Sequence, residues 1–162
     1  MTPLRLLFSL SFVLFPVLAG AQGASVAFGG ISQDTDAPVE VSADSLSVNQ
    51  SAGTAIFTGN VLIVQGDMRL AAPRVLVVYD EEDDAIARLE ATGGVTLVSG
   101  EDAAEAARAD YDIDAGTIVL TGEVLLTQGR NAIGSERMVV RLEDGAAELS
   151  GRVRTVLSPG DR

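Results

Sequence analysis

The chain has 162 residues, enough for one domain of ordinary size, and carries 11 basic against 23 acidic residues. All the basic residues are arginine, and histidine, cysteine and tryptophan are absent. These absences exclude a Cys/His zinc site, a disulfide and a nucleophile activated by histidine. A formal charge of -12 without a basic cluster argues against nucleic acid as a partner. Because 47% of the residues are hydrophobic, we nevertheless expect the chain to fold.

Residues 1–21 have the three parts of a secretory signal peptide. Arg5 is their only charged residue, an apolar run covers residues 6–18, and Ala19-Gly20-Ala21 is a small-x-small cleavage site. The apolar run is shorter than the roughly 20 residues of a membrane span, and Pro16 interrupts it. We therefore expect cleavage after Ala21 and export of the mature chain across an inner membrane.

Composition divides the remainder of the chain into three parts. Residues 22–37 are rich in Gly, Ser and Asp and lack a clear period, so they are predicted to be a flexible lead-in. Residues 38–159 have repeated patterns of alternating hydrophobicity and are predicted to form the folded domain. Residues 160–162 are predicted to be a tail.

The folded part contains internal repeats. When the chain is shifted by 63 residues, residues 45–80 align without gaps on residues 108–143, with 11 identities in 36 positions. Repeats of this kind indicate stacked supersecondary units, each too small to bury its own apolar face. A shorter unit, [Thr/Ser]-Gly-x-Val, occurs four times with its glycines spaced by 34, 29 and 29 residues: Gly59, Gly93, Gly122 and Gly151.

Apolar and polar residues alternate within each unit, and this period of two predicts β-strands with one face inward. A second alternating strand precedes each one, and polar or acidic turns join them. We therefore expect about a dozen strands, nearly all antiparallel, and no helix after the signal peptide. The residues predicted to form this inner face are Leu46, Val48, Phe57, Val61, Ile63, Val75, Val77, Tyr79, Tyr111, Ile118, Leu120, Val124, Leu126, Met138 and Val140.

The four repeat glycines fall on this predicted inner face, where a glycine packs against nothing. One interpretation is that they let each strand bend between two sheets, and another is that they leave room inside. The inner surface is aliphatic and nearly free of polar atoms, which suits hydrocarbon chains better than a hydrogen-bonding ligand. An ordinary, filled sandwich core is the alternative.

Three short motifs, in this order, resemble the OstA-like domain family and, within it, the LptA-like lipopolysaccharide-transport proteins. They are Ala43-Asp44-Ser45-Leu46, Phe57-Thr58-Gly59-Asn60-Val61 and Gly66-Asp67-Met68-Arg69-Leu70. The resemblance implies an all-β fold, a twisted, slightly open β-jelly roll of two antiparallel sheets. It also implies a periplasmic location and binding of the lipid A part of lipopolysaccharide between the sheets.

The resemblance further implies that copies join head to tail through edge strands, in residues 39–48 and residues 152–157. The joined copies would form a bridge from an LptC-like inner-membrane protein to an LptD-like outer-membrane translocon. Arg69 and Arg130 are candidates to lie beside the lipid A phosphates, with an ordinary solvated surface as the alternative.

No catalytic residue, cofactor or metal site is predicted. The densest carboxylate cluster, residues 80–84, lacks the spacing of a calcium-binding loop and lies in a predicted turn. No acidic residue lies on the predicted inner face, so we do not expect an enzyme. Two alternatives to the carrier are a self-assembling structural β module without a lipid ligand and a secreted hydrolase on a β scaffold.

Overall fold

The computed structural model describes residues 23–29, 37–82 and 85–158. The predicted signal peptide, residues 1–21, and the predicted tail, residues 160–162, lie outside these ranges. No helix in the described part of the chain is long and apolar enough to cross a membrane. Its elements are β1 Ala24–Ala27, β2 Glu40–Ser42, β3 Ser45–Asn49, the single 3₁₀ turn η1 Gln50–Ala52, β4 Thr54–Gln65, β5 Met68–Tyr79, β6 Ile86–Ser99, β7 Asp102–Asp112, β8 Thr117–Gln128, β9 Asn131–Arg141, β10 Ala146–Ser150 and β11 Arg154–Val156.

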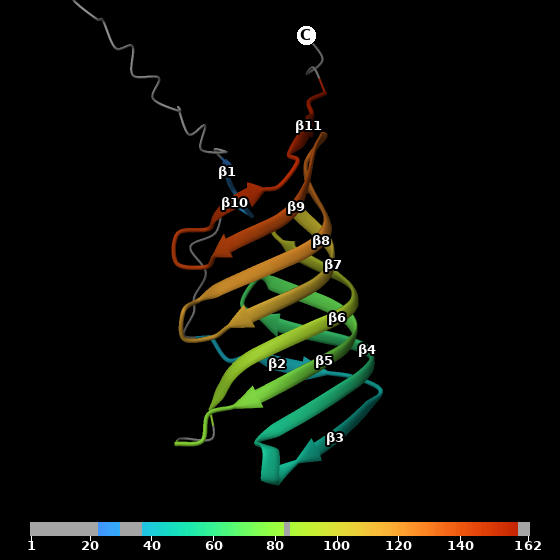
Figure 1. The fold of residues 1–162 in the computed structure, drawn as a ribbon, viewed down its shortest axis with the longest axis vertical. Helices are drawn as coiled ribbons and strands as arrows, with labels where there is room; N and C mark the ends of the chain where they lie inside the picture. Colours follow the sequence, from blue (N-terminus) through green and yellow to red (C-terminus); the bar gives the residue numbers. More distant parts are fainter. Residues whose placement is uncertain (1–22, 30–36, 83–84, 159–162) are drawn as a thin grey trace, which may run out of the picture.

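The strands form one antiparallel sheet in which β4 to β9 each pair with the strands before and after them in the chain, while β10 pairs with β9 and β1. The sheet is stacked along the long axis of the molecule, with β2 and β3 at one end and β10 and β11 at the other (Figure 1). Short polar turns favour this order because they let each strand fold back directly on its predecessor. The all-β fold class and the antiparallel pairing predicted from the alternation are confirmed.

The chain bends at the repeat glycines, three of which lie within β4, β6 and β8, while the fourth follows β10. Gly59, Gly93, Gly122 and Gly151 have φ values of 81°, 92°, 83° and 78°. The pairing register shifts at the first three of these positions. A Cβ added to Gly122 would lie 2.8 Å from the Cβ of Ala107 on β7, so no other residue fits there without displacement. The glycines thus serve the bend, as the first of the two interpretations expects.

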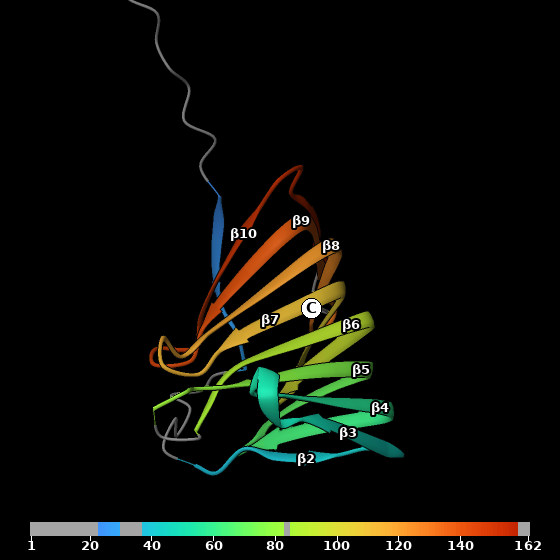
Figure 2. The ribbon, with the colours of Figure 1, turned by 60° about the horizontal axis from the view of Figure 1, so that its bottom comes forward.

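The bends fold the sheet into two arms, and hydrogen bonding along the stack continues through both (Figure 2). We call them arm A and arm B. Arm A consists of β3, β10 and the halves of the long strands in residues 54–58, 74–79, 86–92, 108–112, 117–121 and 137–141. Arm B consists of β2, β11 and residues 61–72, 95–106, 124–135. The two sheets predicted from the sequence are therefore the two arms of one folded sheet.

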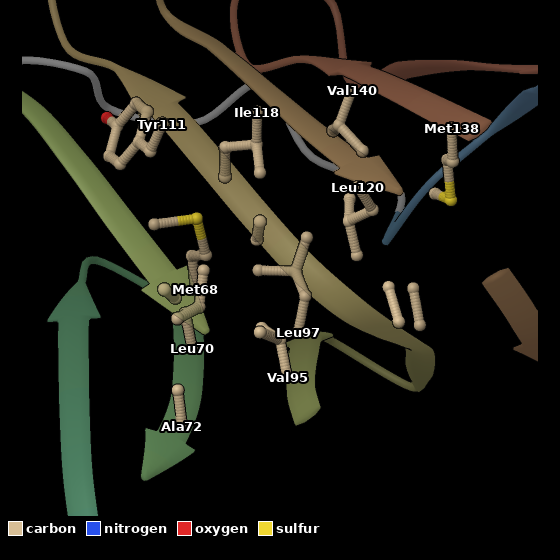
Figure 3. Packing of buried hydrophobic residues seen from close by; sticks show 14 of the residues in the cluster. Met68, Leu70, Ala72, Val95, Leu97, Tyr111, Ile118, Leu120, Met138 and Val140 are labelled. Carbon is tan, nitrogen blue, oxygen red and sulfur yellow. The ribbon is translucent and has the colours of Figure 1, made fainter. Parts of the chain in front are cut away.

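The core lies between the arms. Figure 3 shows side chains from β5 and β6, among them Met68, Leu70 and Leu97, directed into the same interior as Tyr111, Ile118 and Leu120 from β7 and β8. Aliphatic and polar residues alternate along each strand. Each arm therefore presents its aliphatic face to the other arm and its polar face to water.

The prediction that residues 22–37 are a flexible lead-in is wrong for residues 24–29. β1 pairs antiparallel with β10, and it therefore lies at the opposite end of the stack from β2 (Figure 1). Phe28 follows β1, is 3% exposed and belongs to the core. Its N–H donates a 2.8 Å hydrogen bond to the carbonyl of Gly145. The alternating small residues of β1 and the buried ring of Phe28 are enough to hold this short strand against β10.

Candidate functional site

The candidate site is the apolar interior between the two arms. Thirteen of the fifteen residues predicted for the inner face are buried or half-buried there. Phe57 and Tyr79 are half-buried and pack against the core. Eleven are at most 2% exposed: Val61, Ile63, Val75, Val77, Tyr111, Ile118, Leu120, Val124, Leu126, Met138 and Val140.

The remaining two, Leu46 and Val48, are 55% and 58% exposed. Their register partners on β4 are Phe57 and Ala55, so both side chains lie on the inner face of arm A. They are exposed because β3 is the terminal strand of this arm, and β4 is its sheet partner. Leu46 and Val48 therefore lie on the predicted face of the strand but are exposed there.

The protein's own side chains fill the interior in the middle of the stack. Leu97 on arm B and Leu120 on arm A are both 0% exposed, and Leu126 is equally buried. In this region the structure matches the filled core that the sequence left as an alternative, rather than an open trough. Nearer the β3 end there is a hollow of about 380 Å³, which Val48, Gly53 and Tyr79 help to line.

A polar contact joins the two arms away from the bends. The Tyr111 hydroxyl on arm A donates a 2.5 Å hydrogen bond to Oε1 of Gln65, which ends β4 on arm B. Nε2 of Gln65 donates in turn to the carbonyl of Ala37, at 3.0 Å. Burial raises the pKa of Tyr111, because it disfavours the charged phenolate.

A second glutamine holds the N-terminal segment at the other end of the stack. Nε2 of Gln128 donates to the carbonyl of Ala27 at 2.5 Å and to Oδ2 of Asp102 at 2.8 Å. The same carboxylate oxygen accepts a 2.6 Å hydrogen bond from the N–H of Gly29. Gln65 and Gln128 are equivalent in the 63-residue repeat. Neither glutamine was predicted to have a role, although the recurrence of the Gln-Gly pair in the two repeats could have indicated one.

The outer surface of arm A carries charge pairs. The guanidinium of Arg108 lies 2.6 Å from Asp110 and 2.9 Å from Glu90, and hydrogen bonds to these two carboxylates raise its pKa. Arg69 and Arg130 are both exposed on arm B and the turn that follows β8, so they lie outside the apolar interior. In the described ranges no three acidic side chains come together as a metal site, although Asp83 and Asp84 of the acidic turn fall outside those ranges.

Residues 40–146 match the family model described as "LptA/(LptD N-terminal domain) LPS transport protein". The chain belongs to this family. The matched residues run from the start of β2 to the start of β10, so they contain the bends at Gly59, Gly93 and Gly122 and nearly all of the apolar interior. β1 and β11 lie outside the match.

Individual relatives agree with the family assignment. The chain is 26% identical to the lipopolysaccharide export system protein LptA of Escherichia coli K12 over 161 residues, which cover 93% of this chain and 85% of that protein. It is 31% identical over 153 residues to an uncharacterised protein of Rhizobium meliloti, covering 88% and 82%. The crystal structure of LptH, the LptA homologous periplasmic component from Pseudomonas aeruginosa, has the same fold, with a TM-score of 0.69 and 19% identity over 78% of this chain and 99% of that one.

Proposed function

We propose that this family member is a periplasmic carrier that binds the lipid A part of lipopolysaccharide between its arms and passes it from the inner to the outer membrane. The observation that carries the proposal is the continuity of the interior. Every long strand contributes aliphatic side chains to it, and apolar side chains are exposed at both ends of the stack. The relatives named for lipopolysaccharide export support the choice of ligand.

Aliphatic burial supplies enough free energy for such a carrier. Each methylene transferred from water into an apolar site gains about 0.8 kcal/mol, so a dozen-carbon acyl chain gains roughly 10 kcal/mol before ordering costs. The contact is also non-directional, which lets a chain slide along the stack without breaking specific hydrogen bonds. The negative protein surface keeps the anionic phosphates of lipid A in water, outside the interior.

Insertion of an acyl chain requires the arms to part, because their side chains fill the space between them. The arms stay joined at the bends during this motion, since the sheet is continuous there. On the opposite side the arms meet through side chains and through the contact of Tyr111 with Gln65. The exposed inner residues Leu46 and Val48 mark the β3 end as the place where an acyl chain meets the interior first.

The two ends of the stack suit a bridge. At one end β2 and β3 present free edges, and at the other β11 is exposed along its whole length, with Val156 and Leu157 66% and 70% exposed. Strand addition at such edges joins chains through main-chain hydrogen bonds. An LptC-like inner-membrane protein, a second copy of this chain and an LptD-like outer-membrane translocon are the proposed occupants of these ends.

A specific observation favours a second candidate function. A structural β module without a lipid ligand needs a filled middle of the stack, because tight packing of side chains is its only source of stability there. In that case the edge strands alone assemble the protein into the cell envelope.

Photocrosslinking separates these two functions. A photoreactive residue is placed at Phe57, on the inner face near the β3 end, and in a matched variant at Thr58, which is exposed on the opposite face. A carrier incubated with lipopolysaccharide crosslinks from position 57 at least ten times more than from position 58. Equal crosslinking from both positions, or none from either, contradicts the carrier and leaves the structural module.

A further inference from the structure

β1 occupies the place on β10 that the repeat assigns to a first strand such as β3. β4 and β10 are equivalent in the stack, since Ala55, Phe57 and Gly59 of β4 correspond to Ala147, Leu149 and Gly151 of the last repeat. At the start of the stack, β3 covers the free edge of β4. At its end, β1 covers the free edge of β10.

These two edges face opposite ways along the stack, so the pairing to compare with β1 on β10 is that of β5 on β4, and the register is the same. Val75 of β5 lies opposite Phe57, and Val77 lies opposite Ala55. Ala24 of β1 lies opposite Leu149, and Val26 lies opposite Ala147. β3 has the same pattern as β1, since each strand places a serine between two inward residues, Ser47 in β3 and Ser25 in β1. β1 therefore lies where the first strand of a further repeat, equivalent to β3, would lie.

The inward side chains of the two strands differ in size. β3 presents Leu46 and Val48, whereas β1 presents Ala24 and Val26. β1 covers less apolar surface of β10 than β3 would, and its four residues form a short strand. Phe28, buried just beyond β1, supplies the missing anchor, together with the hydrogen bond from Gly29 to Asp102.

We infer that β1 is a self-capping strand, and that β3 of a second copy of this chain displaces it from β10 when copies join head to tail. The inference rests on the bridging function proposed above. The joined register then places Leu46 opposite Leu149, Ser47 opposite Glu148 and Val48 opposite Ala147. Until a second copy arrives, β1 protects the β10 edge from unspecific strand pairing.

Only arm A is capped in this way within the described ranges. On arm B, β11 is exposed along its length, and β2 of the second copy finds that edge open. Docking therefore begins on arm B and finishes on arm A by strand exchange. Such exchange needs no complete unfolding, because a short strand at the end of a sheet opens locally.

A pair of cysteine variants tests the predicted register, since the chain has no cysteine of its own. Ser47→Cys is made in one preparation and Glu148→Cys in another, and the two are mixed under mild oxidation. We expect a disulfide-linked heterodimer, and at least ten times more of it when the Glu148→Cys chain also carries Phe28→Ser, which removes the anchor of β1. Ser25→Asp, an exposed outward change on the same strand, is the control for Phe28→Ser and leaves the yield unchanged.

A locked variant keeps the test independent of how well the Phe28 variant folds. Ser25 and Glu148 are register partners, so Ser25→Cys/Glu148→Cys joins β1 to β10 by a disulfide. We expect self-association, measured by sedimentation velocity, to be at least tenfold weaker in the oxidised form and to recover on reduction. Equal association of the oxidised and reduced forms overturns the self-capping strand.

Lipid capture is measured on the same locked chain. Its crosslinking to lipopolysaccharide from position 57 reports on the carrier alone, because a single copy suffices for capture. A locked chain that captures lipid and still associates normally therefore overturns the cap and supports the carrier. Loss of capture in every variant, with association still controlled by the lock, supports the cap and overturns the carrier.

Discussion

The hydroxyl of Tyr111 and Oε1 of Gln65 form a buried 2.5 Å hydrogen bond that connects the arms on the side away from the bends. The two residues are 46 positions apart and belong to β7 and β4, which are not neighbours in the sheet. The bond therefore stabilises the closed arrangement of the arms without adding to the ladder of the sheet. If the arms part to admit lipid, this contact must open.

Tyr111→Phe should lower the free energy of unfolding by about 1–3 kcal/mol, because it leaves the buried Oε1 of Gln65 without this donor. Urea denaturation followed by far-UV circular dichroism measures the change. Tyr79→Phe is the matched control, since Tyr79 is a half-buried tyrosine on the same inner face. A loss of stability in both variants to the same extent would contradict a specific role of the Tyr111 hydroxyl.

The raised pKa of Tyr111 predicts a loss of stability in base. Burial favours the neutral phenol in the folded state, whereas in the unfolded chain the phenol ionises at its ordinary pKa of 10.0. Above pH 10 the unfolded state therefore binds fewer protons than the folded state, and the free energy of unfolding falls as pH rises. We expect a steeper fall for the wild type than for Tyr111→Phe between pH 9 and pH 11, measured by urea denaturation. Parallel curves for the two proteins would show that this phenol ionises normally in the fold.

The inner and outer faces of β8 should respond differently to truncation. Leu120 is 0% exposed between the arms, so Leu120→Ala should cost about 2–5 kcal/mol of stability through lost burial and a cavity. Thr121 is the next residue and lies on the other face, and Thr121→Ala should cost about 0.5 kcal/mol or less. Thermal and urea denaturation measure both variants. Comparable costs would contradict the assignment of the faces.

The bend at Gly122 combines a left-handed φ of 83° with a close approach to Ala107. Gly122→Ala should therefore destabilise the protein by about 1–3 kcal/mol. The double variant Gly122→Ala/Ala107→Gly removes the close contact but keeps the unfavourable φ, so it should recover only part of that loss. Full recovery would show that the contact alone excludes a side chain, and no recovery would assign the whole cost to the backbone.

The period-two alternation was enough to predict the strands of residues 38–159 and the direction of their side chains. Val75, Leu120 and Val140 are buried as expected, because a strand that alternates in this way buries one face wherever a second layer covers it. The repeat glycines identified the bends for the same reason, since each recurs at a fixed place in its unit.

Features that depend on distant parts of the chain could not be predicted in this way. β1 is four small residues long, and its partner β10 lies more than 100 residues away, so no local pattern connects them. The exposure of Leu46 depends on β3 being the last strand of arm A, and an alternating pattern does not reveal which strand is last. The filled interior likewise depends on the distance between the arms, which side-chain periodicity does not encode.

The way the strands pair also gives the molecule an adjustable reach. From β4 to β9 each strand bonds to its neighbours in the chain, so nothing requires the array to close on itself as a barrel must. Neighbouring strands are about 4.8 Å apart, and one additional hairpin would extend the array by roughly 10 Å. A gain or loss of one hairpin would thus change the distance that the protein covers between two membranes. The strands at its two ends would stay the same.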